Sequence, residues 1–345
     1  MSVVKYIINK KATIREALVA LDGNTHDWQT LFVVDEGKKM VGTLTDGDIR
    51  RGLIRGLELS DPVEMAMHSN FKFVREGQND ALQLKSFREE QIFFIPVLDA
   101  DNHVVKVYNL IKYHNFLPVD AVLMAGGKGE RLRPLTDKTP KPLLPVGDKA
   151  IIDHNVDRLI SYGVKNISVT VNYLAEQIEV HFKEPRQDIQ IQCVRESSFL
   201  GTMGALHLLH VFHNEVVLVM NSDLYTDIDF EDMYLHFMEN EAEMSVAAVP
   251  YNVSVPYGIL DLDGRDIIGL REKPVYNYYA NAGIYLLKRP VLEEIPVGEF
   301  FNATDLIEKL IYKQKRVIRY PLKGTWIDIG TISEYQKAQD LAGRL

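Results

Sequence analysis

The stretch from residue 120 to residue 146 constrains this chain more than any other part of it. It begins with an apolar run at residues 121–124 and passes directly into a glycine-rich turn at residues 126–129. A buried strand that feeds a glycine-rich loop is how α/β proteins bring backbone amides close to phosphate groups. Glycine permits that approach because it has no Cβ atom to block the ligand. The stretch therefore predicts an α/β domain with a phosphate-binding loop.

Two cationic side chains follow the turn. Arg131 can fork onto phosphate oxygens, and Lys141 can act as a point charge. Pro140 and Pro142 stiffen the backbone around Lys141, because proline fixes its own φ and disfavours the helical region for the residue before it. An extended, stiff segment suits a lysine that must be aimed at a ligand.

The loop departs from two common phosphate-binding motifs and matches a third. A Walker loop requires serine or threonine after its Gly-Lys pair, where this chain has Gly129. The dinucleotide-binding loop requires a third glycine where this chain has Leu132. The whole stretch, through Arg131 to the Pro-Lys-Pro at residues 140–142, closely resembles the signature of the sugar-1-phosphate nucleotidyltransferases. The resemblance implies that Leu123, Ala125, Gly126, Gly127 and Gly129 bind the nucleotide.

Bulk properties exclude several kinds of partner. The chain has 345 residues, a net charge of −9 and one cysteine, Cys193. This length allows two or three domains, and the acidic balance argues against nucleic acid bound through a broad basic face. One cysteine forms no internal disulfide, and no apolar run is long enough to span a bilayer. We therefore expect a cytoplasmic protein with neither a membrane nor a nucleic-acid partner.

Residues 1–117 contain an internal repeat. Residues 31–35 match residues 95–99, and the offset is 99 minus 35, or 64 residues. Each copy predicts a helix, a strand, a turn and a second strand, and Thr13 with Glu16 forms a capping box at the start of the first helix. The repeat resembles a tandem pair of cystathionine-β-synthase (CBS) modules, a regulatory unit that commonly binds adenine nucleotides.

The CBS resemblance implies nucleotide-binding residues in the first copy only. In such modules a threonine and the aspartate three residues later contact ribose and phosphate, and here these are Thr45 and Asp48. The second copy has Asn109 and Lys112 instead, which puts a second nucleotide site in doubt. Lys112 could instead face a phosphate of a ligand held by the first copy. The alternative is a module that binds nothing and only mediates contacts between subunits.

In residues 118–345 apolar strands alternate with helical patterns, which predicts an α/β sheet with helices on both faces. The family resemblance implies a Rossmann-like (GT-A-like) mixed sheet and assigns this part as the catalytic domain. Ligands in such sheets collect at the carboxyl ends of the strands. The predicted strands cover residues 121–124, 167–171, 189–194, 216–220, 244–249 and 282–287, and the predicted helices cover residues 152–161, 175–182, 204–211 and 230–239. Residues 334–345 read as an exposed helix without chemistry.

Two carboxylates that lie far apart in the sequence are candidates for a metal site. Asp223 follows the apolar run at residues 216–220, and Asp328 interrupts an apolar stretch near the end of the chain. Magnesium prefers one or two protein carboxylates together with substrate phosphates, and a reacting triphosphate needs such an ion. The resemblance implies that Asp223 and Asp328 share one Mg2+.

Residues 196–205 resemble the loop with which the family reads the base. There Gly201 would let the backbone contact the base, and Glu196 falls where family members place the side chain that reads the base edge. An ionised glutamate only accepts hydrogen bonds. Guanine offers adjacent N–H donors on its pairing edge, whereas uracil and thymine offer one donor between two acceptors. Glu196 therefore favours GTP over UTP or dTTP, and the alternative is a solvated loop residue.

Three further short motifs occur in the family's order, at residues 257–258, 272–274 and 281–285. By resemblance, Glu272 and Asn281 bind the sugar hydroxyls, and Gly258 lines the sugar pocket. Lys273 would hold the phosphate of the sugar 1-phosphate. On its own, the Glu-Lys-Pro at residues 272–274 would read as a charged turn.

The expected reaction joins an NTP, most readily GTP, to a hexose or hexosamine 1-phosphate and releases pyrophosphate. The attacking phosphate is largely a dianion at neutral pH, so no general base is needed. Catalysis then rests on positioning and charge, supplied by Arg131, Lys141, Asp223 and Lys273. Within the family the chain resembles the glucosamine-1-phosphate guanylyltransferases of legionaminic acid biosynthesis and the mannose-1-phosphate guanylyltransferases.

Two other interpretations stay open. One is a uridylyl- or thymidylyltransferase of the same family, and the other is a non-catalytic regulatory homologue that binds nucleotide. In either case we expect a homo-oligomer.

Overall fold

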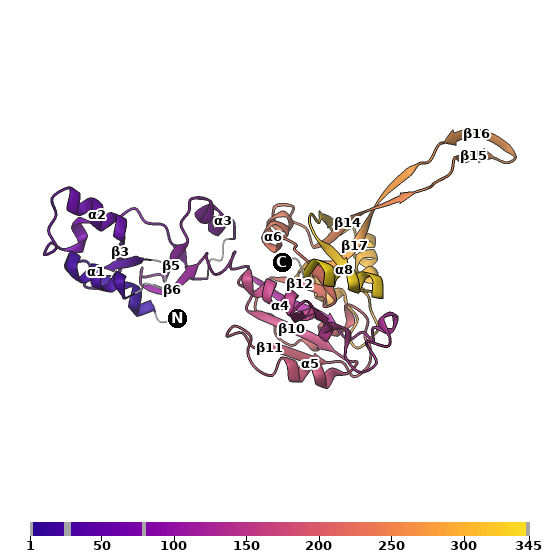
Figure 1. The fold of residues 1–345 in the computed structure, drawn as a ribbon, viewed down its shortest axis with the longest axis horizontal. Coiled ribbons are helices and arrows are strands. Elements are labelled where there is room, and N and C mark those ends of the chain that lie inside the picture. The colour runs from indigo at the N-terminus through magenta and orange to yellow at the C-terminus, as the bar shows by residue number, and fades with distance from the viewer. Residues whose placement is uncertain (1–2, 24–28, 78–80, 343–345) are drawn as a thin grey trace. The chain divides into compact units, whose positions relative to one another are not determined.

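The computed structural model describes residues 3–23, 29–77 and 81–342, and the chain forms two compact units, Met1–Phe116 and Leu117–Leu345 (Figure 1). None of the helices within these described ranges is long and apolar enough to cross a membrane.

Unit 1 consists of two copies of one small fold. The first sheet contains β1 (Ile7–Asn9), β2 (Thr30–Val34) and β3 (Met40–Thr45), and the second contains β4 (Val74–Arg75), β5 (Phe94–Leu98) and β6 (Val104–Asn109). In both copies the first strand is parallel and the third antiparallel to the middle one. Helix α1 (Ile14–Asp22) precedes β2, and α3 (Ala81–Glu89) precedes β5. The predicted order of helix, strand, turn and strand is confirmed, as is the capping box of Thr13 and Glu16.

Equivalent residues of the two copies meet within unit 1. Lys39 and His103, which are 64 positions apart, pair as an antiparallel β-bridge. Phe32 stacks on Phe94 with ring centroids 5.8 Å apart and planes inclined by 4°. Both rings belong to a hydrophobic cluster to which the two copies contribute. Because that cluster is shared, the repeat folds as one body.

The two copies differ after their last strands. In the first copy, α2 (Asp46–Ile54) begins directly after β3. In the second copy, β6 leads into turns, and residues 110–116 form no helix. The second copy therefore lacks the helix at whose N-terminus the first copy carries Thr45 and Asp48.

Unit 2 is centred on a mixed sheet of seven strands in the order β11-β10-β7-β12-β17-β14-β18. Strand β17 is antiparallel to both of its neighbours, and every other adjacent pair is parallel. All six predicted strands are present, and the predicted α/β fold with a mixed sheet is confirmed. The strands are β7 (Val119–Ala125), β10 (Asn166–Val171), β11 (Ile191–Arg195), β12 (Val216–Asn221), β14 (Met244–Ser254), β17 (Val275–Lys288) and β18 (Val317–Pro321).

Helices cover both faces of this sheet. One face packs on α7 (Ala303–Tyr312) and on the 3₁₀ segments η5 (Gly204–Leu208) and η6 (Arg289–Glu294). Alternate residues of the same strands, such as Leu123 and Leu218, are buried on the other face, where α4 (Ile151–Ser161) and α6 (Phe230–Glu239) lie. Helices α4 and α6 meet through Tyr162 and Phe230, whose ring centroids are 5.6 Å apart. Helix α5 (Ala175–His181) links β10 to β11.

The prediction of an α-helix over residues 204–211 was wrong. The segment is the short 3₁₀ turn η5, and residues 209–213 have no regular structure. The amides of Met203 and Gly204 both donate to the carbonyl oxygen of Phe301, at 2.9 and 3.1 Å. A Cβ atom on Gly204 would lie only 2.5 Å from the carbonyl oxygen of Glu299. The backbone conformation of residues 204–208 is thus set by the tight contact with residues 299–301 and not by the helical spacing of its apolar residues.

Helix α8 (Ile332–Ala342) is not the free exposed helix that its sequence predicts. Ala338 is fully buried, and the Tyr335 hydroxyl and the Gln339 amide donate to the carbonyl oxygen of Pro145 at 2.6 and 2.7 Å. Pro145 belongs to the small hairpin β8 (Pro145–Val146) and β9 (Lys149–Ala150). Helix α8 therefore supports the segment that follows Lys141.

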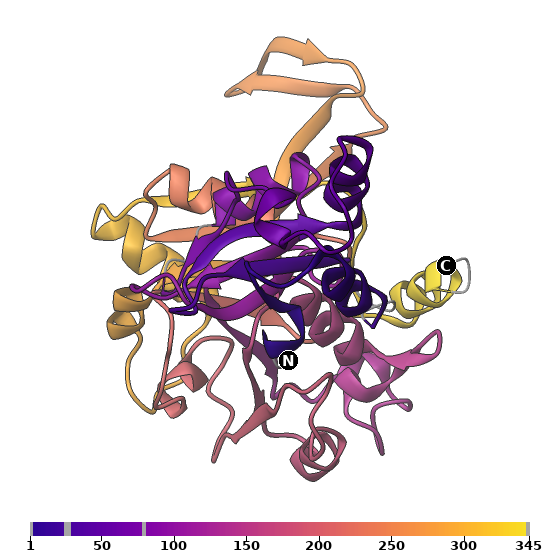
Figure 2. The same cartoon turned by 90° about the vertical axis from the view of Figure 1, so that its left-hand side faces the viewer.

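Strands β14 and β17 continue past the sheet as a two-stranded arm. Strand β18 accompanies β14 only as far as Ala248, whereas β14 and β17 remain paired to Ser254 and Val275. The hairpin of β15 (Ile259–Asp263) and β16 (Asp266–Arg271) forms the tip, and both views show it clear of the helices of unit 2 (Figures 1 and 2). Large side chains that are at least 38% exposed on the arm are Tyr251, Val253, Tyr257, Leu260, Leu262, Ile267, Ile268, Leu270, Val275, Tyr278 and Tyr279.

Candidate functional site

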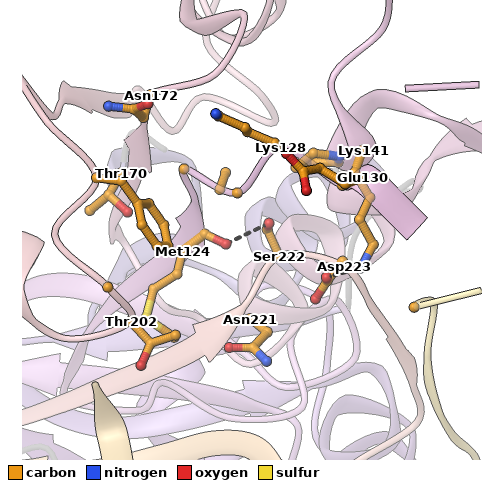
Figure 3. Close-up of a pocket in the computed structure, with 18 of the residues that line it drawn as sticks. Met124, Lys128, Glu130, Lys141, Thr170, Asn172, Thr202, Asn221, Ser222 and Asp223 are labelled. Atoms are coloured by element: carbon orange, nitrogen blue, oxygen red, sulfur yellow. Dashed lines mark hydrogen bonds and ion pairs between the residues drawn. The ribbon is translucent and has the colours of Figure 1, made fainter. Parts of the chain in front are cut away.

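A cavity of about 630 Å³ opens in unit 2 at the carboxyl ends of β7, β10 and β12 (Figure 3). Each strand delivers polar groups to it. The Ser222 hydroxyl donates to the carbonyl oxygen of Met124 at 2.7 Å and so joins the ends of β12 and β7. The cavity lies at the sheet edge at which ligands of such folds collect. The predicted residues that line it are Ala125, Gly126, Gly127, Gly129, Arg131, Lys141, Glu196, Gly201 and Asp223.

Leu123 lies elsewhere. Its side chain is fully buried within β7, and it is not among the residues that line the cavity. Side chains alternate between the two faces of a strand, and Met124, the next residue, reaches the cavity instead. The structure thus gives Leu123 a place in the core.

The glycines of the turn make room for other residues of the site. Gly129 has a positive φ of 62°, and a Cβ atom there would lie 3.0 Å from both the Lys141 Cβ and the Thr136 Cγ2. A Cβ atom on Gly126 would lie 2.6 Å from the Glu196 Oε1. These two positions require glycine because the lysine and the glutamate pack directly against the loop.

Lys141 and Asp223 line the cavity, and both lie near Asp328, which is not one of the lining residues. The Lys141 Nζ forms an ion pair with the Asp223 Oδ2 and lies 3.9 Å from the Asp328 Oδ1. The antiparallel pairing of β13 (Leu224–Thr226) with β19 (Trp326–Asp328) places Leu224 opposite Asp328. Figure 3 shows Lys141 reaching toward Asp223. Two carboxylates separated by more than a hundred residues are thus held around one ammonium group.

The two carboxylates could bind a divalent cation whose remaining coordination positions are filled by oxygens of a bound ligand. Burial raises the pKa of Asp328, and the neighbouring Asp223 raises it further, while Lys141 opposes the rise. The Asp223 Oδ1 is buried and has no hydrogen-bond partner among the described residues. Nor do those residues hold a group of three or more His, Cys, Asp or Glu side chains arranged as metal ligands. A pair of carboxylates is what magnesium uses when phosphates supply the other oxygens.

Arg131 also lines the cavity. It belongs to the 3₁₀ turn η3 (Glu130–Leu132), and a Cβ atom on Gly330 would lie 2.9 Å from the Arg131 Nη2. The guanidinium is also close enough to Asp328 to lower the pKa of that carboxyl. The exposed arginine and the buried Lys141 therefore flank the pair of aspartates.

Glu196, another residue of the cavity lining, is buried, with 4% of its surface exposed. Its Oε2 accepts a hydrogen bond from the Leu200 amide at 3.0 Å. Burial raises the pKa of Glu196, while bonds from Leu200 and from the Thr170 hydroxyl oppose the rise. The structure contradicts the interpretation of Glu196 as a solvated loop residue. Its carboxylate faces the cavity beside Gly126.

Gly201 is fixed by the same loop. It has a positive φ of 77°, and a Cβ atom there would lie 2.7 Å from the carbonyl oxygen of Phe301. The Asn302 Oδ1 accepts from the Thr202 amide at 3.3 Å. The loop that was predicted to read the base therefore contacts the start of α7, which its sequence did not reveal.

The predicted sugar-binding residues do not reach the cavity. Gly258 and Glu272 are neighbours, because a Cβ atom on Gly258 would lie 3.0 Å from the Glu272 Oε2. Both are on the arm, as is the exposed Lys273. Asn281, at the base of the arm, donates to the Tyr285 hydroxyl at 2.9 Å. None of these four residues lines the cavity.

In unit 1, Thr45 and Asp48 form the N-cap of α2. The Asp48 Oδ2 accepts from the Thr45 amide at 2.9 Å and from its hydroxyl at 2.6 Å, and Arg51 donates to the Asp48 Oδ1 at 2.7 Å. Burial opposes ionisation of Asp48, but these bonds lower its pKa overall. In the second copy the Asn109 Oδ1 accepts from the amides of Ile111 and Lys112. Both motifs thus have a structural role at a chain turn.

Several polar residues of the cavity were missing from the predicted site, among them Thr170, Asn172 and Asn221. Thr170 and Asn172 stand at the end of β10, and Asn221 ends β12. The Asn172 amide donates to the backbone carbonyl of Glu196 at 3.1 Å. The carboxyl-end rule that singled out Asp223 would have found Asn172 if it had been applied to every predicted strand.

Comparisons with known proteins agree with this geometry. A provisionally named mannose-1-phosphate guanyltransferase of Sulfolobus acidocaldarius is 32% identical over 223 residues, which are 64% of this chain and 62% of that protein. A D-glycero-alpha-D-manno-heptose 1-phosphate guanylyltransferase of Campylobacter jejuni is 28% identical over 63% of this chain and 97% of its own length.

Among solved structures, a provisionally named glucose-1-phosphate thymidylyltransferase of Bacillus anthracis, in complex with sucrose, superimposes with a TM-score of 0.54. It is 26% identical and covers 66% of this chain and 96% of its own. Residues 3–55 match the CBS domain family, and residues 120–343 match the family described as nucleotidyl transferase. This chain therefore belongs to the nucleotidyl transferase family.

Proposed function

We propose that this protein transfers GMP from GTP to a hexose or hexosamine 1-phosphate, giving a GDP-sugar and pyrophosphate. The observation that carries the proposal is the meeting of Lys141, Asp223 and Asp328 beside a cavity that opens behind the glycine turn. Family membership supports the reaction type, and the names of the Sulfolobus and Campylobacter relatives support a guanylyl donor.

In the proposed reaction, a phosphate oxygen of the sugar 1-phosphate forms a bond to the α-phosphorus of GTP. The bond from that phosphorus to the oxygen bridging to the β-phosphorus breaks, and pyrophosphate leaves with the electron pair. No proton has to be removed, because the second pKa of a phosphate monoester is near ~6. The protein's task is therefore to hold two anionic reactants in line and to offset their charge.

The residues of the cavity divide this task. Arg131 would hold the β- and γ-phosphates, Lys141 the α-phosphate, and the backbone amides of the glycine turn the remaining oxygens. Members of this family generally use a divalent metal. We assign Mg2+ to Asp223 and Asp328, where it would supply positive charge to the phosphates when bound. Lys273 would hold the incoming phosphate.

Glu196 and Gly201 support the choice of GTP. A buried carboxylate that faces the cavity can accept from the adjacent N–H donors of guanine, and Gly201 brings backbone groups to the same wall. The alternative within the family is uridylyl or thymidylyl transfer. The name of the Bacillus relative, a thymidylyltransferase, supports the second of these. The alternative of a non-catalytic homologue is disfavoured because Arg131, Lys141 and both aspartates are present.

Pyrophosphate release tests the proposal directly. The protein is assayed with GTP, UTP, dTTP and ATP against glucosamine, mannose, glucose and heptose 1-phosphates, with and without EDTA. We expect turnover with GTP and one of these sugars, and loss of turnover with EDTA. Comparable rates with UTP would contradict the role of Glu196, and no release with any pair would contradict the reaction. When Lys141→Ala is measured in the same assay, its control is Lys165→Ala, which removes an exposed lysine outside the cavity.

We propose that the whole protein is homo-oligomeric and cytoplasmic. For unit 1 we propose that Thr45 and Asp48 bind a regulatory adenine nucleotide. The match of residues 3–55 to the CBS domain family supports the proposal for unit 1. A thermal-shift titration with AMP, ADP and ATP tests it, with Asp48→Asn as the matched variant. A melting temperature that no adenine nucleotide changes would leave the module as a mediator of subunit contacts.

A further inference from the structure

The tip of the arm is an amphipathic hairpin whose apolar face is exposed. Leu260 lies opposite Leu270, and Leu262 lies opposite Ile267, so these four side chains share one face. They are 49%, 62%, 59% and 63% exposed, respectively. The other face carries polar groups, among them the ion pair of Asp261 with Arg271. Antiparallel sheets of this kind normally bury their apolar face against a core.

The arm as a whole exposes enough apolar surface for an interface. With the four tip residues, Tyr257 and Ile268 are 73% and 69% exposed. At roughly 100 Å² each, the exposed large side chains on both faces of the arm sum to on the order of 1,000 Å², and the four of the tip's apolar face supply about 400 Å² of it, against ~800 Å² per partner in stable interfaces. An isolated two-stranded hairpin is marginally stable in water, so this surface calls for a partner.

The arm carries Lys273 away from the cavity of its own chain. Strand β17 leaves the sheet where Gly283 touches Asn221, a residue that lines the cavity. Lys273 precedes Gly283 by ten residues of largely extended chain, which span roughly 30 Å. The ladder between β14 and β17 is unbroken from Ala248 to Ser254. A lysine side chain cannot bridge such a distance.

The side chains that line the cavity carry no excess of positive charge. Its lining contains three cationic residues, Lys128, Arg131 and Lys141, and three acidic ones, Glu130, Glu196 and Asp223. The two substrates of the proposed reaction carry together roughly six negative charges. The rim of the cavity also presents apolar rings, because Phe199 and Phe300 are 51% and 57% exposed with centroids 5.8 Å apart.

We propose that the arm of one copy of this chain docks, by its apolar face, on the Phe199–Phe300 rim of a second copy. Lys273 and Glu272 of the arm then complete the sugar 1-phosphate site in that second copy. The inference rests on the proposed function, because it assigns to Lys273 the incoming phosphate. If each of two copies docks its arm on the other, each cavity receives the Lys273 of the other chain.

Complementation between two inactive variants tests the exchange. Asp223→Asn removes a cavity residue, and Lys273→Ala removes the arm residue, so each pure variant should lose about nine-tenths or more of its activity when sugar 1-phosphate is well below its KM. In a two-fold dimer with exchanged arms, a mixed dimer contains one site with an intact cavity and an intact arm. Co-expressed variants, purified through a different tag on each, should show about half of wild-type activity per dimer. No recovery in the mixed dimer would overturn the proposal, because an arm that serves its own chain leaves both sites defective.

A second measurement does not depend on turnover. Ile267→Lys with Leu270→Lys changes only exposed tip residues, and Arg265→Ala at the tip turn is the matched control. By light scattering during gel filtration, wild type and control should be dimers or larger, and the double variant should be smaller. A monomeric wild type, or a double variant with unchanged mass, would overturn the proposal. If the wild type turns over no substrate pair, the proposed function fails, and this mass comparison alone decides the docking of the arm.

Discussion

The cavity and the arm of unit 2 carry two parts of one predicted site, yet the chain holds them in opposite ways. In the cavity, Lys141 is 8% exposed and Glu196 is 4% exposed, and each packs against a glycine that would clash if it had a Cβ atom. On the arm, Glu272 and Lys273 are exposed in the bend between β16 and β17. We infer that the proposed nucleotide side is formed within one copy of the chain, whereas the proposed sugar side is completed only when the arm docks on a second copy.

The largest effect is expected in the cavity. Lys141→Ala should lower turnover by on the order of a hundredfold or more, because a charge that stabilises the reacting phosphates is lost. Asp223→Asn should have an effect of similar size. Steady-state pyrophosphate release with saturating GTP measures both. Rates near that of wild type in either variant would mean that the preformed part of the site lies elsewhere.

The next effect separates the arm from the cavity. Lys273→Ala should raise the KM for sugar 1-phosphate by about tenfold or more and leave the KM for GTP unchanged, because only the incoming phosphate loses a partner. Arg265→Ala, a cation on the same arm, should alter neither value. If Lys273→Ala raises the KM for GTP instead, the arm contacts the nucleotide, and the proposed division between a nucleotide-binding cavity and a sugar-binding arm is wrong.

A smaller effect concerns the rigidity of the cavity wall. Gly201→Ala should lower the free energy of unfolding by about 1–3 kcal/mol, because it strains a positive φ and crowds the Phe301 carbonyl. Gly264→Ala, at a positive φ in open space on the arm, should cost less. Urea titrations followed by tryptophan fluorescence compare the two. Equal costs would show that backbone strain alone decides both positions.

The smallest effect is one of pH. Burial and Asp223 raise the pKa of Asp328, so its ionised form is disfavoured in the folded state. This penalty is present at neutral pH and disappears below the unfolded pKa of about 4, where Asp328 is protonated in both states. In EDTA at pH 7, Asp328→Asn should therefore melt at a slightly higher temperature than wild type, and the difference should shrink as the pH falls toward 4. A lower melting temperature at pH 7 would show that Lys141 outweighs the repulsion.

Apolar runs predicted six of the seven strands of the large sheet, most clearly those whose residues are nearly all buried, as in β7 and β12, whereas the more exposed β18 was not predicted. Helical periodicity failed for residues 204–211, where the carbonyl of Phe301, about a hundred positions away, decides the backbone. The same limit applies to α8, whose contact with Pro145 is a tertiary one. Patterns within a window report on local structure, and neither contact is local.

The cavity residues were predictable where a motif and a strand end coincide, as at Gly126 and Asp223. The meeting of Asp328 with Asp223 came from resemblance, since nothing in the neighbourhood of Asp328 reveals its partner. The position of Lys273 on an arm outside the cavity was not predictable, because a motif indicates which residue is used and not where the fold places it.

The contact between Gly126 and Glu196 has an evolutionary consequence. The loop that would grip phosphate and the carboxylate that would select the base share one small space. A change of donor nucleotide at position 196 therefore cannot be separated from the geometry of the turn. A side chain at position 126 should be tolerated only where residue 196 is smaller than glutamate, so lineages that replace Gly126 would carry a substitution at position 196 as well.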